Sequence, residues 1–371
     1  MRPMTVVQLL PALESGGVER STLEISAALT QAGQRALVVS AGGRLLPALR
    51  EVGAEHFSWA IGRKSPWTLR YISALRSLFV RERVDIVHAR SRLPAWIGYL
   101  AWRGMPAARR PHFITTMHGL NSSGRYSAIM TRGERVICVS DTVRRYLLER
   151  YPATDARKLR VIARGIDPEA FPARPRPDPA ARAAVGERYP ALKTAEPLLL
   201  LPGRGTRLKG HADALRLLAV LRREGYPRAR LWLPGACEVG REDYLNELRA
   251  EAERLGIAEA ALFTPATSRM AEAYAASDLV LQLSRKPEAF GRTVVEALSV
   301  GRPVLGWAHG GVGELLSQLQ PQGAVTPFDE AALARIGIAL LKDPPPFPAT
   351  IPYTLRAMQT ATLAVYEELL G

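Results

Sequence analysis

The chain has 371 residues, of which 47% are hydrophobic and 23% charged, a composition typical of a globular protein that buries two cores. It holds no run of about eighteen apolar residues, so no membrane-spanning helix is predicted. The net charge of +15 is unevenly placed: residues 1–170 carry 26 Lys and Arg against 13 Asp and Glu, and residues 171–371 carry 24 against 22. This imbalance indicates a polyanionic partner of the first half, nucleic acid or an anionic membrane surface, or a basic surface that serves only solubility.

Cysteine usage and the N-terminal residues are those expected of a cytoplasmic protein. The only two cysteines, Cys138 and Cys237, lie in different halves and form no cluster with histidines. We therefore expect two buried thiols and neither a disulfide framework nor a structural zinc site. The first apolar run is followed directly by Glu14 and Glu19, which is unlike a signal peptide, so we interpret it as a buried strand.

The first 170 residues alternate short apolar runs with segments whose apolar residues recur at helical spacing. Buried strands are expected at 5–10, 35–41, 84–90, 112–119 and 135–140, and a helix at 67–80. Such alternation predicts a doubly wound parallel sheet in an N-terminal domain, residues 1–170.

A second series follows a proline-rich break. Residues 171–195 have the composition of a linker or an exposed excursion. Further strands are expected at 198–205, 230–235, 261–265, 278–284 and 303–307, within a second Rossmann-like domain, residues 196–353. Residues 354–371 predict a closing helix with an apolar stripe that packs back on the N-terminal domain.

Loops that follow strands are the first candidates for a binding site, because ligands of open α/β sheets bind beyond the carboxyl ends of the strands. Gly16 and Gly17 stand between the first strand and the first helix, where the backbone can approach a ligand, although such a pair is often only a turn. In the second domain, Arg204 and Lys209 precede a helix start and could clamp a diphosphate or lie on a solvated loop.

The richest stretch is KPEAFGRTVVEAL, which runs from a strand into a helix. Thr293 and Glu296 fall near one face if the helix starts near Phe290, and Glu288 lies in the preceding loop. Two carboxylates, the open backbone of Gly291 and a helix N-terminus could together bind hydroxyls and an anion; two surface glutamates at a helix start are the alternative.

Glu288 and Glu296, separated by seven residues in PEAFGRTVVEALSVGRPVL, closely resemble the hallmark of the retaining glycosyltransferases of family 4, which have the GT-B fold. The resemblance covers nearly the whole chain and includes GGVER, VDIVHAR, ITTMHG, ICVSDTVRRYL, RVIARGID, GRGTRLKGH and HGGVGELL. It implies an α/β protein of the GT-B class, with two Rossmann-like doubly wound domains that face a central cleft.

The resemblance also implies roles. Glu296 would bind ribose hydroxyls, Glu288 the donor sugar, and Arg204 and Lys209 the diphosphate. The implied catalytic residues are Glu288, His118, Arg204 and Lys209. The implied donor-binding residues are Gly16, Gly17, Arg204, Lys209, Phe290, Gly291, Arg292, Thr293 and Glu296.

The implied reaction is transfer of a hexose from a UDP- or GDP-sugar with retention of configuration, without metal and without a further cofactor. The leaving phosphate would accept the acceptor's proton. One departure is Arg164, which stands in RVIARGID where relatives commonly have asparagine or a similar polar residue. His88 is expected to be structural, whereas His211 could be either a helix-start residue or a phosphate neighbour.

The basic N-terminal half suggests the acceptor. Residues 67–83 place aromatic and aliphatic side chains among arginines, a pattern that can lie on an anionic membrane surface or form a buried amphipathic helix with snorkelling arginines. We expect a cell-envelope glycan or glycolipid acceptor, such as lipopolysaccharide core, with a soluble acceptor as the alternative. The enzyme is expected to be cytoplasmic or peripheral on the cytoplasmic face of the inner membrane.

Two other functions remain open at this point. Sugar-nucleotide 2-epimerases share the fold but transfer nothing to an acceptor. A nucleic-acid-binding protein would fit the charge, but the sequence offers no aromatic-basic stacking platform, so no nucleic-acid partner is expected.

Overall fold

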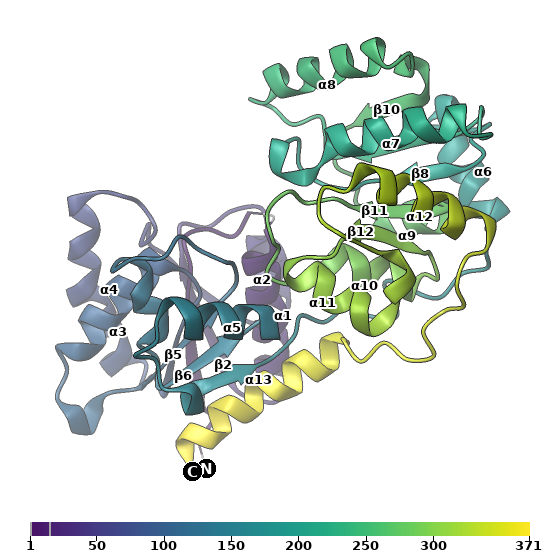
Figure 1. Cartoon of the computed structure of the whole chain (residues 1–371). Coiled ribbons are helices and arrows are strands. Elements are labelled where there is room, and N and C mark those ends of the chain that lie inside the picture. Colours follow the sequence, from purple (N-terminus) through teal and green to yellow (C-terminus); the bar gives the residue numbers. More distant parts are fainter. Residues whose placement is uncertain (1, 15) are drawn as a thin grey trace. The chain divides into compact units, whose positions relative to one another are not determined.

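The computed structural model describes residues 2–14 and 16–371, which form two compact units (Figure 1). The first unit contains the residues up to Gly165 together with Leu355–Gly371, and the second contains Ile166–Thr354. Among the described residues, no helix combines the length and the hydropathy needed to cross a bilayer.

The first unit is built on a seven-stranded parallel sheet in the order β3-β2-β1-β4-β5-β6-β7. Its strands are β1 (Thr5–Leu9), β2 (Arg35–Ser40), β3 (Glu55–Ser58), β4 (Ile86–Ala89), β5 (His112–Met117), β6 (Arg135–Cys138) and β7 (Leu159–Val161). The central strands β1 and β4 are buried at every residue, which is why they read as continuous apolar runs in the sequence.

The helices of this unit are α1 (Gly17–Gln31), α2 (Leu46–Glu51), α3 (Tyr71–Arg81), α4 (Arg92–Arg103), α5 (Asp141–Arg150) and α13 (Leu355–Leu370). Short 3₁₀ turns lie at Pro66–Arg70, Ala107–Arg109, Ser127–Thr131 and Ala156–Lys158. The unit thus combines residues from both ends of the sequence.

The C-terminal helix α13 packs against the core of the first unit. Met358, Val365 and Tyr366 are buried together with residues of α1 and of the sheet. The Tyr366 hydroxyl lies 2.7 Å from Nδ1 of buried His88 on β4, so it links α13 to the sheet. Arg135 and Arg160 hold Glu368 near the end of the helix, and their hydrogen bonds lower the pKa of its carboxyl to about 2.

The second unit is built on a six-stranded parallel sheet in the order β10-β9-β8-β11-β12-β13. Its strands are β8 (Leu198–Leu200), β9 (Arg230–Pro234), β10 (Ala261–Thr264), β11 (Leu279–Gln282), β12 (Val304–Trp307) and β13 (Ala324–Val325). Its helices are α6 (Pro179–Arg188), α7 (His211–Arg223), α8 (Glu242–Arg254), α9 (Met270–Ala276), α10 (Arg292–Ser299), α11 (Gly310–Leu319) and α12 (Glu330–Lys342). Short 3₁₀ turns lie at Pro190–Leu192, Arg207–Lys209, Ala258–Ala260 and Pro321–Gly323.

The expected fold class, α/β with two Rossmann-like doubly wound domains, is confirmed in the architecture of each unit. The proline-rich segment 171–195 differs from a loose linker, because it contains α6 and belongs to the second unit. Arg182 on α6 pairs with Asp278 at 2.7 Å and donates to the carbonyl oxygens of Ala195 and Ala276. The contacts with Ala276 and Asp278 hold the segment against α9 and the amino end of β11.

We predict that Tyr366→Phe destabilises the first unit by about 1–3 kcal/mol, because a buried imidazole nitrogen of His88 loses its partner. The measurement is the free energy of unfolding in urea. Tyr126→Phe, which changes a half-exposed tyrosine of the same unit, should cost less than about 0.5 kcal/mol. Equal losses in the two variants would contradict the role given to the hydroxyl.

Candidate functional site

The candidate site lies at the carboxyl edge of the second sheet, where the strand order reverses. Strand β8 has β9 on one side and β11 on the other, so the loops that follow β8 and β11 diverge from a topological switch point. Ligands of doubly wound sheets bind at such points. The loop after β8 carries Lys209, and the loop after β11 carries Glu288.

The two loops are held in direct contact. The amide of Arg285 donates to the carbonyl oxygen of Leu208 at 2.8 Å. Gly210 permits this approach, because a Cβ at this position would lie 2.0 Å from the carbonyl oxygen of Leu283. Its φ of +76° is also in the left-handed region that favours glycine.

This contact brings two of the expected site residues together. Lys209 Nζ lies 2.5 Å from Glu288 Oε1, and both side chains remain partly accessible to solvent. Ser284 donates to the same carboxylate oxygen at 2.5 Å, and Gln282 donates to Oε2 at 3.3 Å. The carboxylate is therefore held by one cation and two neutral donors, all from the loops and strand at the switch point.

The loop that carries Glu288 is also fixed from its other side, by the start of α11. The Gly311 amide donates to the carbonyl oxygen of Glu288 at 2.7 Å. A Cβ on Gly311 would lie 2.4 Å from the carbonyl oxygen of Phe290, so the HGG sequence is needed for this packing. His309 Nε2 lies 2.7 Å from the carbonyl oxygen of Ser284 and fixes the end of β11.

Glu296 lies on α10 and is 7% exposed. The Tyr274 hydroxyl donates to its Oε2 at 2.9 Å, and Arg292 Nε lies 3.5 Å from its Oε1. Burial, and then the nearby Glu296 carboxylate, raise the pKa of Tyr274 well above its usual value, so its hydroxyl keeps its proton. Tyr274 is a site residue that the sequence analysis missed; its position in YAASD, before the DLVLQLS strand, was the available signal.

The remaining expected donor-binding residues of this unit lie around the same edge. Helix α10 begins at Arg292, two residues later than the expected start, with Gly291 at φ +103° as its N-cap. Phe290 is buried against the ring of Tyr353 at 5.6 Å, and Thr293 is partly buried in the first turn of α10. The side chain of Arg204 is exposed on the loop after β8.

The other expected residues lie at the carboxyl edge of the first sheet. Gly16 and Gly17 are exposed at the start of α1, and a Cβ on Gly16 would collide with the Glu19 carboxylate. His118 directly follows β5, and Arg164 donates to its Nδ1. Burial, and then Arg164 and two further groups, hold the pKa of His118 well below its usual value.

The two ambiguous histidines are both buried. His88 bonds to Tyr366 and, through Nε2, to Thr116 at 2.6 Å, which fits the expected structural role. His211 is fully buried at the start of α7, and burial lowers its pKa to about 4. It is therefore neutral at neutral pH and adds no positive charge to the loop after β8.

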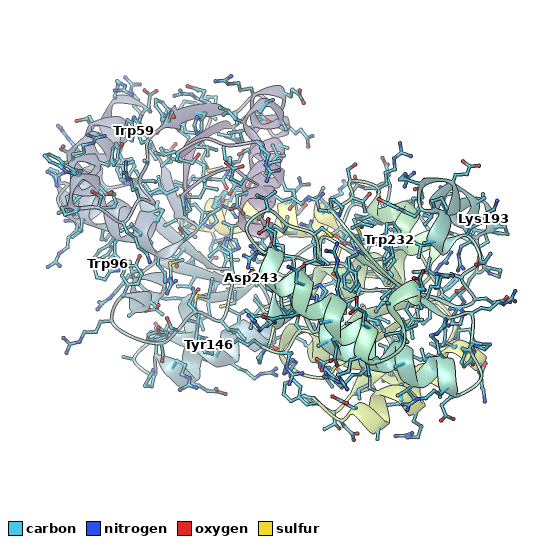
Figure 2. The ribbon with its side chains drawn as sticks, turned by 90° about the horizontal axis from the view of Figure 1, so that it is seen from above. Trp59, Trp96, Tyr146, Lys193, Trp232 and Asp243 are labelled. Carbon is cyan, nitrogen blue, oxygen red and sulfur yellow. The ribbon has the colours of Figure 1, made fainter. Side chains whose placement is uncertain are left out.

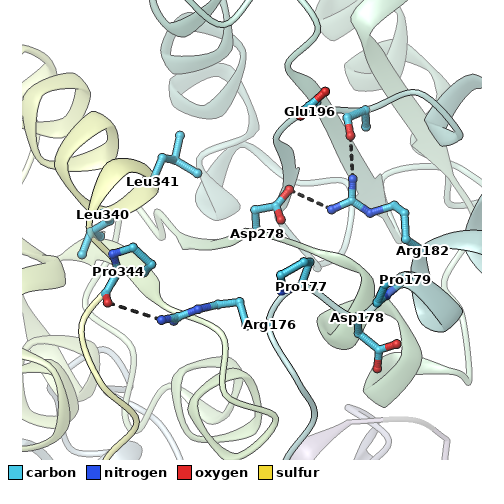
Figure 3. A pocket seen from close by; sticks show the side chains of 11 residues that line it. Arg176, Pro177, Asp178, Pro179, Arg182, Glu196, Asp278, Leu340, Leu341 and Pro344 are labelled. Carbon is cyan, nitrogen blue, oxygen red and sulfur yellow. Dashed lines mark hydrogen bonds and ion pairs between the residues drawn. The ribbon is translucent and has the colours of Figure 1, made fainter.

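A hollow of about 510 Å³ lies elsewhere in the second unit (Figure 3). Its lining includes Asp278 and Glu196, which stand at the amino ends of β11 and β8, and the Arg182 that pins α6. It is thus at the opposite edge of the sheet from Lys209 and Glu288. Within residues 2–14 and 16–371, no three His, Cys, Asp or Glu side chains cluster closely enough to hold a metal ion.

The chain has two Rossmann-like units, each built on a parallel sheet, and a cation and two carboxylates lie near the switch point of the second. These are the features of the GT-B class of glycosyltransferases. The family description "Glycosyltransferase Family 4" matches residues 15–170, and "Glycosyl transferases group 1" matches residues 188–354. The chain therefore belongs to the glycosyltransferases that combine a family 4 N-terminal domain with a group 1 C-terminal domain.

Individual proteins agree with this assignment. D-inositol 3-phosphate glycosyltransferase of Rhodococcus opacus is 30% identical over 248 residues, which cover 62% of this chain and 53% of that protein. This chain thus matches about half the length of that curated relative. A glycosyltransferase from Rickettsia africae has a crystal structure with a TM-score of 0.85 and 26% identity, covering 100% of this chain and 99% of that one. Anabaena HepE, crystallised with UDP and glucose, shares the fold with a TM-score of 0.77 and 20% identity, covering 98% of this chain and 95% of that one.

We predict that Gly210→Ala costs more stability than Gly225→Ala. Both glycines have positive φ, but a Cβ on Gly225 meets no atom within 4 Å, whereas one on Gly210 collides with Leu283. The shared left-handed conformation costs about 1–2 kcal/mol in each variant, and the collision adds about 1–3 kcal/mol in Gly210→Ala. Urea unfolding followed by circular dichroism measures the difference. If the two variants lose the same stability, the loop after β8 is not packed on β11 as described.

Proposed function

We propose that the protein is a retaining glycosyltransferase that moves a hexose or related sugar from a UDP- or GDP-sugar to a cell-envelope glycan, such as lipopolysaccharide core or another lipid-linked saccharide. The observation that carries the proposal is the pairing of Lys209 with Glu288 at the switch point, with Glu296 buried on the helix that follows. The UDP and glucose named with Anabaena HepE support a nucleotide-sugar donor.

In the proposed donor site, Lys209 and Arg204 hold the diphosphate, since cations that face developing negative charge stabilise a departing phosphate. Glu296 accepts hydrogen bonds from ribose hydroxyls, and its Tyr274 partner keeps one carboxylate oxygen in place. Glu288 accepts hydrogen bonds from the sugar. The N-terminal amides of α10 supply further donors.

The ion pair gives this site a specific first step. An incoming diphosphate carries more negative charge than a single carboxylate and competes for Lys209. When Lys209 moves to the diphosphate, Glu288 becomes available for the sugar hydroxyls while Ser284 still donates to it. Donor binding thus exchanges one partner of each charged group without leaving either one unpaired.

The proposed transfer needs no protein base. The bond between the anomeric carbon and the phosphate oxygen breaks, and its electron pair stays on the diphosphate. The acceptor hydroxyl oxygen bonds to the anomeric carbon from the same face, and its proton passes to the departing phosphate oxygen. The groups described here supply charge and hydrogen bonds, so we propose a reaction without metal and without a further cofactor.

We predict that Lys209→Met and Glu296→Gln each weaken binding of one nucleotide, UDP or GDP, by at least about tenfold, or about 1.4 kcal/mol, because each loses a charged contact with the donor. Isothermal titration calorimetry measures the dissociation constants. Lys193→Met is the control, since Lys193 (labelled in Figure 2) is an exposed lysine of the same unit that precedes β8, whereas the site lies beyond the carboxyl end of that strand. Unchanged binding in both site variants, or no binding of either nucleotide to the unaltered protein, would contradict the donor site.

A membrane contact of segment 67–83 would not involve the apolar face of its helix. In α3 the apolar residues Leu75, Leu78 and Phe79 are buried, so this part of segment 67–83 forms an amphipathic helix packed on its own domain. The exposed apolar side chains of the segment are Trp67 and Leu69, at 76% and 56%, in the 3₁₀ turn before the helix, and Val80, at 55%, near the end of α3. Trp67 and Leu69 are the two that lie close together.

Contacts with neighbouring residues fix this turn, and the sequence around it is basic. Trp59 (labelled in Figure 2) stacks on Tyr71 with ring centroids 5.9 Å apart, and Thr68 donates to the carbonyl oxygen of Arg63 at 2.6 Å. Residues 56–81 contain five Lys and Arg and no Asp or Glu. We propose that Trp67 and Leu69 enter the interface of an anionic bilayer at the cytoplasmic face of the inner membrane, where a lipid-linked acceptor would be met.

We predict that the protein sediments with phosphatidylglycerol vesicles and not with phosphatidylcholine vesicles, and that Trp67→Ser reduces the bound fraction several-fold. Val239→Ser removes an even more exposed apolar side chain (97%) from the second unit and should leave binding unchanged. Binding that survives Trp67→Ser, or fails with both lipids, would contradict the membrane surface. The second outcome would favour a soluble phosphorylated acceptor, which the name of the Rhodococcus relative also supports.

A further inference from the structure

His118 and Arg164, which belong to different sequence motifs, contact each other in the structure. His118 directly follows β5, and Arg164 follows β7, which is separated from β5 by β6 alone, so two segments at the carboxyl edge of the first sheet bring them together. Arg164 Nη2 contacts His118 Nδ1. Arg164 also stands where the family resemblance leads us to expect asparagine, so the chain has a cation at this place in the fold.

The chemistry of the guanidinium decides the tautomer of the ring. Arginine has only donors and remains protonated in proteins, so His118 Nδ1 must be the acceptor. A neutral imidazole that accepts at Nδ1 carries its proton on Nε2. His118 Nε2 is shielded from solvent and has no hydrogen-bond partner among the described residues. The ring therefore presents a buried N–H with nothing to receive it.

Burial, and then the groups around the ring, lower the pKa of His118 and favour its neutral form. The groups that face His118 are Arg164, Arg90, which follows β4, and His88 on β4 itself. Arg90 is 3% exposed, and its Nε and Nη2 also have no partner among the described residues. After burial, these neighbours are what hold the pKa of His118 well below its usual value, and all three disfavour a second proton.

We propose that Arg164 is a positioning residue that fixes His118 as a neutral hydrogen-bond donor, with its Nε2 proton directed at an oxygen of the sugar substrate. The substrate part of this inference rests on the proposed glycosyltransferase function. A donor at Nε2 with Nδ1 already occupied cannot take up the proton of the acceptor hydroxyl. His118 then binds and orients substrate, while the departing phosphate takes the proton.

The tautomer is tested first on the full chain by nitrogen NMR of the histidine rings, with His118→Gln to assign the resonance. We expect a protonated, pyrrole-type Nε2 and an unprotonated Nδ1 from pH 8 down to about pH 5.5, below the ordinary histidine pKa of about 6.5. Arg164→Lys, which keeps a cationic donor, should preserve this state; Arg164→Met should mix the tautomers. Arg103→Met is the control for loss of an exposed arginine in the same unit. An Nδ1–H tautomer, or an imidazolium at pH 7, would overturn the inference even if nucleotide binding is normal.

Kinetics then test the role in the reaction. Glutamine can accept from Arg164 through its amide oxygen and donate through its amide nitrogen, so His118→Gln should retain kcat within about tenfold. His118→Leu, which has neither group, should lose at least about a hundredfold. Equal losses in the two variants would mean that His118 acts as a base, which overturns the proposal. Nucleotide binding by calorimetry separates this failure from failure of the proposed function, because it does not depend on the tautomer.

Discussion

The candidate site of the second unit is centred on one charged contact, the ion pair between Lys209 and Glu288 across the switch point of the sheet. A lysine and a glutamate separated by 79 positions can meet there only because two parallel strands end side by side and their loops pack on each other. That packing requires backbone to approach backbone at Gly210 and Gly311, where a Cβ would collide with carbonyl oxygens. The chemistry of the site is thus set by main-chain contacts that the glycines permit.

The two units use charge in different ways. In the second unit the cation faces a carboxylate, and neutral donors complete the arrangement, so the site holds its charges paired until an anion competes for them. In the first unit, burial, and then two nearby arginines, lower the pKa of His118 and favour its neutral form. One edge is suited to a diphosphate, and the other to a fixed, uncharged hydrogen-bond donor. This division fits a reaction in which the leaving group, and not a side chain, takes the proton.

The sequence predicted most of the fold because buried parallel strands appear as uninterrupted apolar runs. The three strands it missed lack that signal. β3 is an edge strand of Glu55–Ser58 without a fully buried residue, β7 has three residues of which only Leu159 is buried, and β13 has only two residues. Helix α6 lay hidden in a proline-rich stretch, because Asp178 caps it and a proline at its first position suits a helix start. The 67–83 segment was ambiguous because periodicity alone does not reveal which face a neighbouring helix covers.

The candidate site was predictable to a similar extent. Local motifs located Lys209, Glu288 and Glu296, since each lies in a short loop or helical segment with a recognisable pattern. Their partners were not predictable, because Tyr274 reaches Glu296 from another helix and Arg164 reaches His118 from another strand. Contacts of this kind follow from sheet order and helix packing, which no short pattern encodes.

The central claim, that a nucleotide sugar binds at the carboxyl edge of the second sheet, is tested most directly by amide hydrogen exchange with and without saturating UDP or GDP. The account predicts new protection in residues 203–211 and 288–296, and no change around Arg176, Arg182 and Pro344 at the opposite edge (Figure 3). Protection confined to the opposite edge, or protection nowhere under conditions in which calorimetry detects binding, would contradict it.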